Sequence, residues 1–398
     1  MKILVCPHQM GMGGSQLNAV EMAVAVKRHG HEAVVYAPEG ILTDALESMD
    51  VPWIPAHDAR LHGGRWATRL GQVIRSEGVE LVHSYEWRPC LQAAFAGGLR
   101  TPMLMSVMAM DVPRFLPRHL PLVVGIPALQ RRMMAEGRTA YLLEPPVDMK
   151  RYSTRDVDGA RKRWGIDRKE IVISAVSMLT TDLEKLQGIL SAIAVVDRLA
   201  GTTPVRLLVA GDGEGAATVN ERAEQVNLRH GRTVIQPVGF QLDPVPVYEA
   251  ADIVLGMGSS AIKGLAHGKA LIVQGEGGFW KVADETTVGG FMDKGWFGSN
   301  GAGARDLLAG LADLVGDERK RHRLGVLGRS LVEGRYGLSH AAAELSGIYV
   351  ETAMRPRRLG ETTMSLARSA ATSAKYFATM QLGGVVEREK WARQGATA

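Results

Sequence analysis

The sequence has 398 residues, of which 46% are hydrophobic and 22% are charged. This is ordinary globular composition, so it excludes a disordered or fibrous chain, and the length suits two or three domains. We interpret the net charge of +5 as that of a mildly basic soluble protein and expect no nucleic-acid partner. Cys6 and Cys90 lie in apolar segments and predict reduced thiols, and no Cys/His spacing indicates a metal site.

The first part of the chain alternates between short apolar runs and helix-like stretches. Continuous apolar strands separated by helices are typical of a parallel sheet covered on both faces. A helix is expected at residues 16–29, between the first two strands. The strands are expected at residues 3–6, 32–36, 79–83, 102–107 and 120–124.

Residues 144–148 interrupt this pattern, because Pro145 and Pro146 exclude a helix there. A second alternation follows, with strands expected at residues 171–176, 205–210, 233–237, 253–256 and 270–273 and helices at 188–199, 245–250, 261–267 and within 303–353. We therefore expect an α/β protein with two facing Rossmann-like domains, at residues 1–150 and 151–350, and a helical tail at 351–398. Arg355-Pro356-Arg357-Arg358 is expected to be a linker that opens this tail.

A glycine-rich turn follows the first strand, and Gly13 and Gly14 stand directly before the expected helix. Glycine lets a ligand approach the backbone, and a helix N-terminus offers free amides to an anion. The spacing differs from the G-x-G-x-x-G pattern of dinucleotide sites, and the next strand does not end in an acidic residue. The sequence therefore gives only weak support for a dinucleotide site. A tight turn without a ligand remains the alternative.

Three comparable turns follow strands of the second domain. The carboxyl ends of such strands are where open α/β sheets bind ligands. Their joint occurrence indicates an anion site more strongly than any one turn does. Lys185, after the strand at 171–176, is a candidate for contacting a phosphate, with a solvated surface lysine as the alternative. The turns contain Gly211 with Gly213; Gly256, Gly258, Ser259 and Ser260; and Glu276 with Gly277.

These segments together resemble the retaining glycosyltransferases of family 4, which have the GT-B fold. The likeness covers about residues 1–350, and its motifs occur in the family's order. They are Met12-Gly13-Gly14-Ser15 with Arg28-His29-Gly30-His31-Glu32, Glu144-Pro145-Pro146-Val147-Asp148, Ser177-Met178-Leu179 through Lys185, Leu208-Val209-Ala210-Gly211-Asp212-Gly213, Tyr248-Glu249-Ala250-Ala251-Asp252, and Gly264-Leu265-Ala266-His267-Gly268.

The resemblance implies transfer of a sugar, with retention and without a metal, from a nucleotide-diphosphate donor to an acceptor. The donor, UDP- or GDP-linked, is a co-substrate, so no cofactor is expected. By position, Lys185 would bind the diphosphate. Glycan, lipid and natural-product acceptors remain open, and His83, at the end of a strand, is either an acceptor-side catalytic residue or a structural histidine. The implied donor-binding residues are Gly13, Gly14, Gly211, Gly239, Gly256, Gly258, Ser259, Ser260, Glu276 and Gly277.

The sequence departs from the family at three functional positions. Met178 stands where an arginine is usual, and Leu255 and Lys263 stand where a glutamate pair is usual. We hypothesise that Lys263 replaces the lost arginine as a phosphate cation and that Glu276 holds the ribose. A catalytically degenerate relative that binds a partner glycosyltransferase or a nucleotide is the second hypothesis. The remaining alternatives are an epimerase, which the missing glutamates disfavour, and an unrelated two-domain α/β enzyme.

The chain opens directly into a strand and contains no apolar run of ~18 residues, so we expect a cytoplasmic protein. Residues 362–380 mix apolar, small and basic side chains, and residues 387–393 are highly charged. This pattern fits a helix that packs back on the domains, a solvated tail, or a peripheral contact with a membrane surface.

Overall fold

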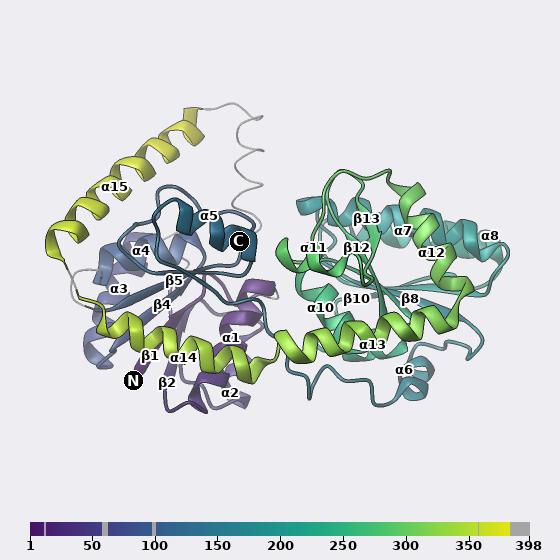
Figure 1. Cartoon of the computed structure of the whole chain (residues 1–398), viewed down its shortest axis with the longest axis horizontal. Helices are drawn as coiled ribbons and strands as arrows, with labels where there is room; N and C mark the ends of the chain where they lie inside the picture. The colour runs from purple at the N-terminus through teal and green to yellow at the C-terminus, as the bar shows by residue number, and fades with distance from the viewer. Residues whose placement is uncertain (12, 58–62, 98–100, 357, 383–398) are drawn as a thin grey trace. The chain divides into compact units, whose positions relative to one another are not determined.

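The computed structural model describes residues 1–11, 13–57, 63–97, 101–356 and 358–382 (Figure 1). The chain folds into two compact units. The first contains Met1–Pro146 together with the residues from Leu338 onward, and the second is Val147–Gly337. The chain therefore leaves the first unit at the predicted proline-rich segment and returns to it near the C-terminus.

The first unit is built on a seven-stranded sheet in which every neighbouring pair of strands is parallel. The strand order is β3-β2-β1-β4-β5-β6-β7. All the carboxyl ends therefore lie at one edge of this sheet. The strands are β1 (Lys2–Cys6), β2 (Glu32–Ala37), β3 (Trp53–Pro55), β4 (Leu81–Tyr85), β5 (Met103–Val107), β6 (Leu122–Val124) and β7 (Ala140–Leu142).

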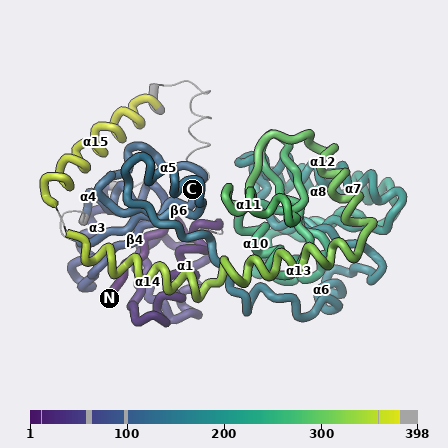
Figure 2. Tube along the Cα trace, in the orientation of Figure 1, coloured from purple at the N-terminus to yellow at the C-terminus, as the bar shows by residue number. Residues whose placement is uncertain are grey.

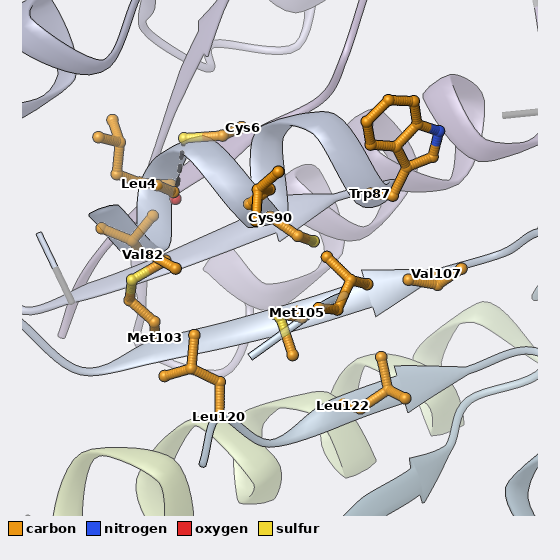
Figure 3. Packing of buried hydrophobic residues seen from close by; sticks show 14 of the residues in the cluster. Leu4, Cys6, Val82, Trp87, Cys90, Met103, Met105, Val107, Leu120 and Leu122 are labelled. Carbon is orange, nitrogen blue, oxygen red and sulfur yellow. Dashed lines mark hydrogen bonds between the residues drawn. The ribbon is translucent and has the colours of Figure 1, made fainter. Parts of the chain in front are cut away.

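Both faces of this sheet are buried, because successive side chains of a strand point to opposite faces. Leu4 and Cys6 of β1 enter one hydrophobic core, shown in Figure 3, and Ile3 and Val5 enter the other. The first core is covered by α3 (Gly63–Ser76), α4 (Trp87–Gly97), α5 (Pro127–Ala135) and α15 (Leu359–Leu382), and the second by α1 (Gly14–Lys27), α2 (Thr43–Ser48) and α14 (Leu338–Met354).

The second unit has a six-stranded sheet of order β10-β9-β8-β11-β12-β13, in which only β13 is antiparallel to its neighbour. The strands are β8 (Ile171–Val176), β9 (Val205–Ala210), β10 (Ile235–Gly239), β11 (Ile253–Gly256), β12 (Ala270–Gln274) and β13 (Trp280–Val282). Its helices are α6 (Val157–Arg163), the short 3-10 helix η1 (Asp182–Glu184), α7 (Lys185–Ala200), α8 (Ala216–His230), α9 (Val245–Ala250), α10 (Gly258–Ala266), α11 (Val288–Asp293), α12 (Ala304–Gly316) and α13 (Glu318–Arg335).

The fold confirms the predicted class, with two Rossmann-like α/β units and a C-terminal helix. Residues 338–350, which the sequence analysis placed in the second domain, form most of α14 and belong to the first unit because α14 packs on α1 and β5 (Figure 2). Tyr85 ends β4 and Trp87 begins α4, so a single residue, Glu86, separates this strand from the next helix.

The C-terminal helix α15 lies against the first unit. The hydroxyl of Ser365 accepts hydrogen bonds from the backbone amides of Arg118 and His119, at 2.9 and 3.3 Å. Tyr376 packs against Phe115 and Trp87, with ring centroids 4.9 and 6.3 Å away. The helix therefore packs back on its own unit. Arg357 of the expected linker and the charged segment at residues 387–393 lie outside the described residues.

Candidate functional site

The carboxyl edge of the second sheet brings together most of the predicted donor-binding residues. After β8 the chain continues to β9 on one side, and β11 pairs with β8 on the other, so β8 and β11 form a topological switch point. Open α/β sheets bind ligands at such a point, because the loops there diverge to opposite faces. The loop before Lys185 follows β8, and the turn at residues 257–260 follows β11.

Two of the glycines at this edge are required by packing between loops. A Cβ atom on Gly211 would lie 1.8 Å from the carbonyl oxygen of Ser177, and one on Gly213 would lie 2.8 Å from that of Leu179. The amide of Gly211 also donates to the carbonyl of Gly239, at 2.9 Å. These contacts explain the glycines without a ligand, so their donor-binding role stays a prediction.

The turn at residues 257–260 starts α10 and leaves donors available. The hydroxyl of Ser260 accepts from the amide of Met257 at 3.2 Å, and the amide of Gly258 donates to Trp296 at 3.0 Å. Within the described ranges, no hydrogen bond uses the amide or hydroxyl of Ser259. The α10 N-terminus, with its positive dipole end, therefore presents free donors suited to an anion.

Glu276 lies in the turn after β12, which is fixed by a second loop. Its amide donates to Gly298 at 3.0 Å, and its carbonyl accepts from Asn300 at 2.9 Å. The carboxylate of Glu276 is half-buried and has no partner in the part of the chain that the structure describes. Gly277, next to it, is exposed. A rigid backbone thus presents an acceptor group at the same edge as the α10 N-terminus.

Lys185 is the first residue of α7 and follows a strained segment. Leu183 and Glu184 have φ of 50° and 54°, a left-handed conformation that costs a non-glycine residue about 1 kcal/mol or more. Lys185 Nζ lies 2.8 Å from Asp182 Oδ2, and its side chain is about one-fifth exposed. The ammonium is therefore held by one carboxylate at the start of the helix that follows β8.

Three residues that the sequence analysis did not identify hold this strained segment. Gln274 donates from Nε2 to the carbonyl of Glu184 at 3.0 Å, and the amide of Gly278 donates to Glu184 Oε2 at 3.4 Å. Gln274 fits only because Gly188 of α7 lacks a side chain: a Cβ there would lie 1.8 Å from Nε2. A glycine inside an otherwise strong helix was the signal available in the sequence.

The residues at the family's usual functional positions have other surroundings here. Lys263 is 9% exposed, and its Nζ lies 4.9 Å from the centroid of the Tyr152 ring, a cation–π contact. Leu255 is buried in the core of β11, and Met178 is 49% exposed. The structure thus places Lys263 against an aromatic ring, and its suggested role with a phosphate stays a prediction.

In the first unit, β1 and β4 form the corresponding switch point. Gly13 is the N-cap of α1 with extended backbone, and Gly14 is its exposed first residue. A Cβ on Gly13 would lie 2.2 Å from Oε1 of Gln16, so this glycine admits the glutamine side chain. The helix therefore begins where the sequence analysis expected it, and its binding of a ligand stays a prediction. The packing of Gln16 explains Gly13 without a ligand.

Glu86, directly after β4, is the most unusual residue of this edge. It has φ of 67° and is 1% exposed. Oε1 accepts from the amide of Met108 at 3.1 Å, while Oε2 and the Ser15 hydroxyl are buried and form no well-aligned hydrogen bond with any described residue. Burial raises the pKa of Glu86 to about 7, and the nearby Ser15 side chain opposes part of this increase. The carboxyl can therefore change charge near neutral pH.

His83 lies inside the first unit. It is fully buried, with Nδ1 2.8 Å from the hydroxyl of Tyr349 and Nε2 2.7 Å from that of Ser106. Burial lowers the pKa of His83 to about 3, so the ring is neutral at physiological pH. Nδ1 thus joins β4 to α14, and Nε2 joins β4 to Ser106 of β5. Because both ring nitrogens are occupied, we retain the structural interpretation and propose no catalytic role.

No family model matches this sequence, and a comparison with curated proteins finds no relative. Solved structures do match over most of the chain. A glycosyltransferase from Rickettsia africae aligns with a TM-score of 0.68 at 15% identity, covering 89% of this chain and 99% of that one. Anabaena Alr3699/HepE in complex with UDP aligns with a TM-score of 0.69 at 16% identity, covering 88% and 100%.

A putative UDP-N-acetylglucosamine 2-epimerase from Listeria monocytogenes also matches, with a TM-score of 0.62 at 14% identity, covering 90% of this chain and 98% of that one. At such low identities the likeness establishes the fold alone. The chain has the two-unit α/β architecture of GT-B glycosyltransferases, an architecture that the epimerase shares.

Proposed function

We propose that this protein is a glycosyltransferase that takes a sugar from a nucleotide-diphosphate donor bound at the carboxyl edge of the second sheet. The observation that carries the proposal is the placement of Lys185 and the free donors of Ser259 at one switch point. Anabaena HepE, which has the same fold, has been solved with UDP and with UDP-glucose.

The proposed chemistry rests on the charge of the leaving group. When the bond to the sugar breaks, negative charge develops on the β-phosphate of the nucleotide. The ammonium of Lys185 and the amide of Ser259 at the α10 N-terminus would stabilise that charge, so no metal is required. Retention at the sugar carbon follows from the resemblance to family 4 and forms part of the proposal.

The remaining contacts of the donor are assigned by chemistry. An ammonium has no acceptor for ribose hydroxyls. The carboxylate of Glu276, which has no partner among the described residues, can accept hydrogen bonds from two ribose hydroxyls. We therefore assign the ribose to Glu276, and a UDP- or GDP-linked donor fits this assignment equally. A glycan, lipid or natural-product acceptor would bind the first unit, and peripheral membrane contact also remains a proposal.

One observation favours the second candidate, a nucleotide-binding protein without turnover. Leu255 and Lys263 replace the usual glutamate pair. Lys263 contacts the ring of Tyr152 and forms no ion pair with any carboxylate that the structure describes. Such a protein would bind the nucleotide through Lys185 and Ser259 but would not cleave the bond to the sugar.

A two-stage experiment separates these candidates. UDP and GDP are first added in a thermal unfolding assay, because a ligand that binds only the folded protein raises the apparent Tm. UDP-sugars and GDP-sugars are then incubated with the protein and the released nucleotide is measured. Stabilisation with nucleotide release supports the transferase, and stabilisation without release supports the second candidate. If there is neither stabilisation nor release, both candidates are rejected.

A further inference from the structure

A cavity of about 390 Å³ lies in the first unit, away from the edge where β1 and β4 end at the glycine turn and Glu86. Its wall includes residues 101–103, 118–121 and 139, which precede or begin the parallel strands β5, β6 and β7. The other wall consists of Thr352 in α14, residues 355, 356 and 358, and the first three turns of α15. The cavity is therefore at the amino edge of the sheet and is separate from the proposed acceptor side.

This cavity is strongly cationic. Arg118, Arg355, Arg358 and Arg368 line it, against a single acidic lining residue, Glu361. The Arg118 guanidinium is 3.6 Å from Glu136, and Arg355 donates to the hydroxyl of Thr139 at 2.7 Å. Arg358 and Arg368 pair with no carboxylate anywhere in the described ranges. An excess of guanidinium groups in one concave site favours an anion, above all a phosphate.

Buried neutral groups in the same cavity also lack partners. Among the described residues, the hydroxyl of Thr352, a residue that is 5% exposed, has no hydrogen-bond partner, and neither ring nitrogen of His119 has one. Buried polar atoms in folded proteins nearly always have a partner, so their presence here points to a bound polar group. Burial lowers the pKa of His119 and so favours the neutral ring, and a neutral imidazole has one nitrogen that donates.

The same cavity has apolar side chains at its rim. Leu359 and Met364 of α15 line it and are 68% and 75% exposed. Met354, at the end of α14, is 78% exposed. No helix in the described part of the chain is long and apolar enough to cross a membrane. Exposed apolar residues beside a cationic hollow are suited to the boundary between lipid headgroups and acyl chains.

We propose that this cavity binds the phosphate headgroup of an anionic lipid. Arg358 and Arg368 contact the phosphate oxygens, the Thr352 hydroxyl donates to one of them, and Leu359 with Met364 contacts the acyl chains. The bond of Ser365 to the backbone of residues 118 and 119 fixes α15 in the position that forms the cavity. This site is independent of the nucleotide site in the second unit.

The test is co-sedimentation of the full chain with vesicles of phosphatidylcholine alone or mixed with phosphatidic acid. The variant carries Arg358→Gln and Arg368→Gln. A matched control carries Arg305→Gln and Arg319→Gln, which removes the same charge from exposed arginines that have no ion pair among the described residues. We expect the wild type and the control to bind mixed vesicles and the variant to bind about tenfold or more weakly.

Three results would overturn the proposal. The wild type does not bind mixed vesicles, the double arginine variant binds them as well as the wild type does, or inorganic phosphate raises the Tm of a protein that binds no vesicles. A second variant, Leu359→Ser with Met364→Ser, is expected to lose vesicle binding without losing charge. Nucleotide-induced stabilisation, measured in the same preparations, is expected to stay unchanged in all of them. Loss of vesicle binding is thereby distinguished from failure of the proposed transferase function.

Discussion

Lys185 Nζ and Asp182 Oδ2 lie 2.8 Å apart in the first turn after β8, so the proposed phosphate cation is already neutralised by a neighbouring carboxylate. A bound diphosphate would compete with Asp182 for the ammonium. We predict that Lys185→Ala weakens UDP binding by about tenfold, whereas Asp182→Asn strengthens it several-fold because the competing charge is gone. Isothermal titration of both variants measures this.

Lys162→Ala, at an exposed position of α6, is the matched control and is expected to bind as the wild type does. A loss of affinity in Asp182→Asn as large as that in Lys185→Ala would show that the pair is structural, and would remove Lys185 from the proposed site.

Gly188 is predicted to be essential for the strained segment. Gly188→Ala places a methyl group on Gln274, breaks its bond to Glu184, and is expected to lower the free energy of unfolding by about 2 kcal/mol and to weaken nucleotide binding. Gly347→Ala is the control, since this helical glycine has open space around it and alanine there is expected to stabilise by about 1 kcal/mol. Urea unfolding compares the two, and equal changes would contradict the account.

Glu276 is predicted to recognise ribose and not phosphate. Glu276→Gln should weaken UDP binding by about tenfold because a carboxylate accepts more strongly from hydroxyl groups than an amide does. Pyrophosphate has no ribose, so its affinity should not fall. A parallel loss for both ligands in competition titrations would mean that Glu276 acts through the fold of its loop.

Glu86 predicts a dependence of stability on pH. Its folded pKa of about 7 is above the usual 4.5, so the folded state binds more protons between these values and stability falls as pH rises through this window. Across this window the free energy of unfolding falls by about 3 kcal/mol. Glu86→Gln mimics the neutral carboxyl and should remove the loss, so the variant should gain stability over the wild type at pH 8 but not at pH 4. Urea midpoints at both pH values measure this, and a constant difference would contradict it.

Much of the fold could be predicted from the sequence, because buried parallel strands are continuous apolar runs. The expected strands at residues 171–176, 205–210 and 253–256 match β8, β9 and β11. The three-residue strands β3 and β7 were not predicted, whereas β6, of the same length, was, because it lies within the apolar run at residues 120–124. The position of α14 depends on tertiary packing onto α1, which local periodicity does not encode.

The candidate site was predicted only in part. Glycine turns at strand ends are visible in a sequence, and they led to Lys185 and the α10 N-terminus. Gly188 signals only that some group approaches α7 closely. The sequence does not identify that group as Gln274, because Gln274 and Glu184 are 90 positions apart, and it does not predict the left-handed backbone of Glu184. His83 was equally ambiguous until both of its partners were known.

The central claim is that a nucleotide diphosphate binds where β8 and β11 end. Hydrogen–deuterium exchange of the full chain with and without UDP or GDP tests it most directly, because it reports which backbone amides become protected. The account predicts protection at residues 177–185 and 257–260. Tight nucleotide binding with protection confined to other segments would contradict it.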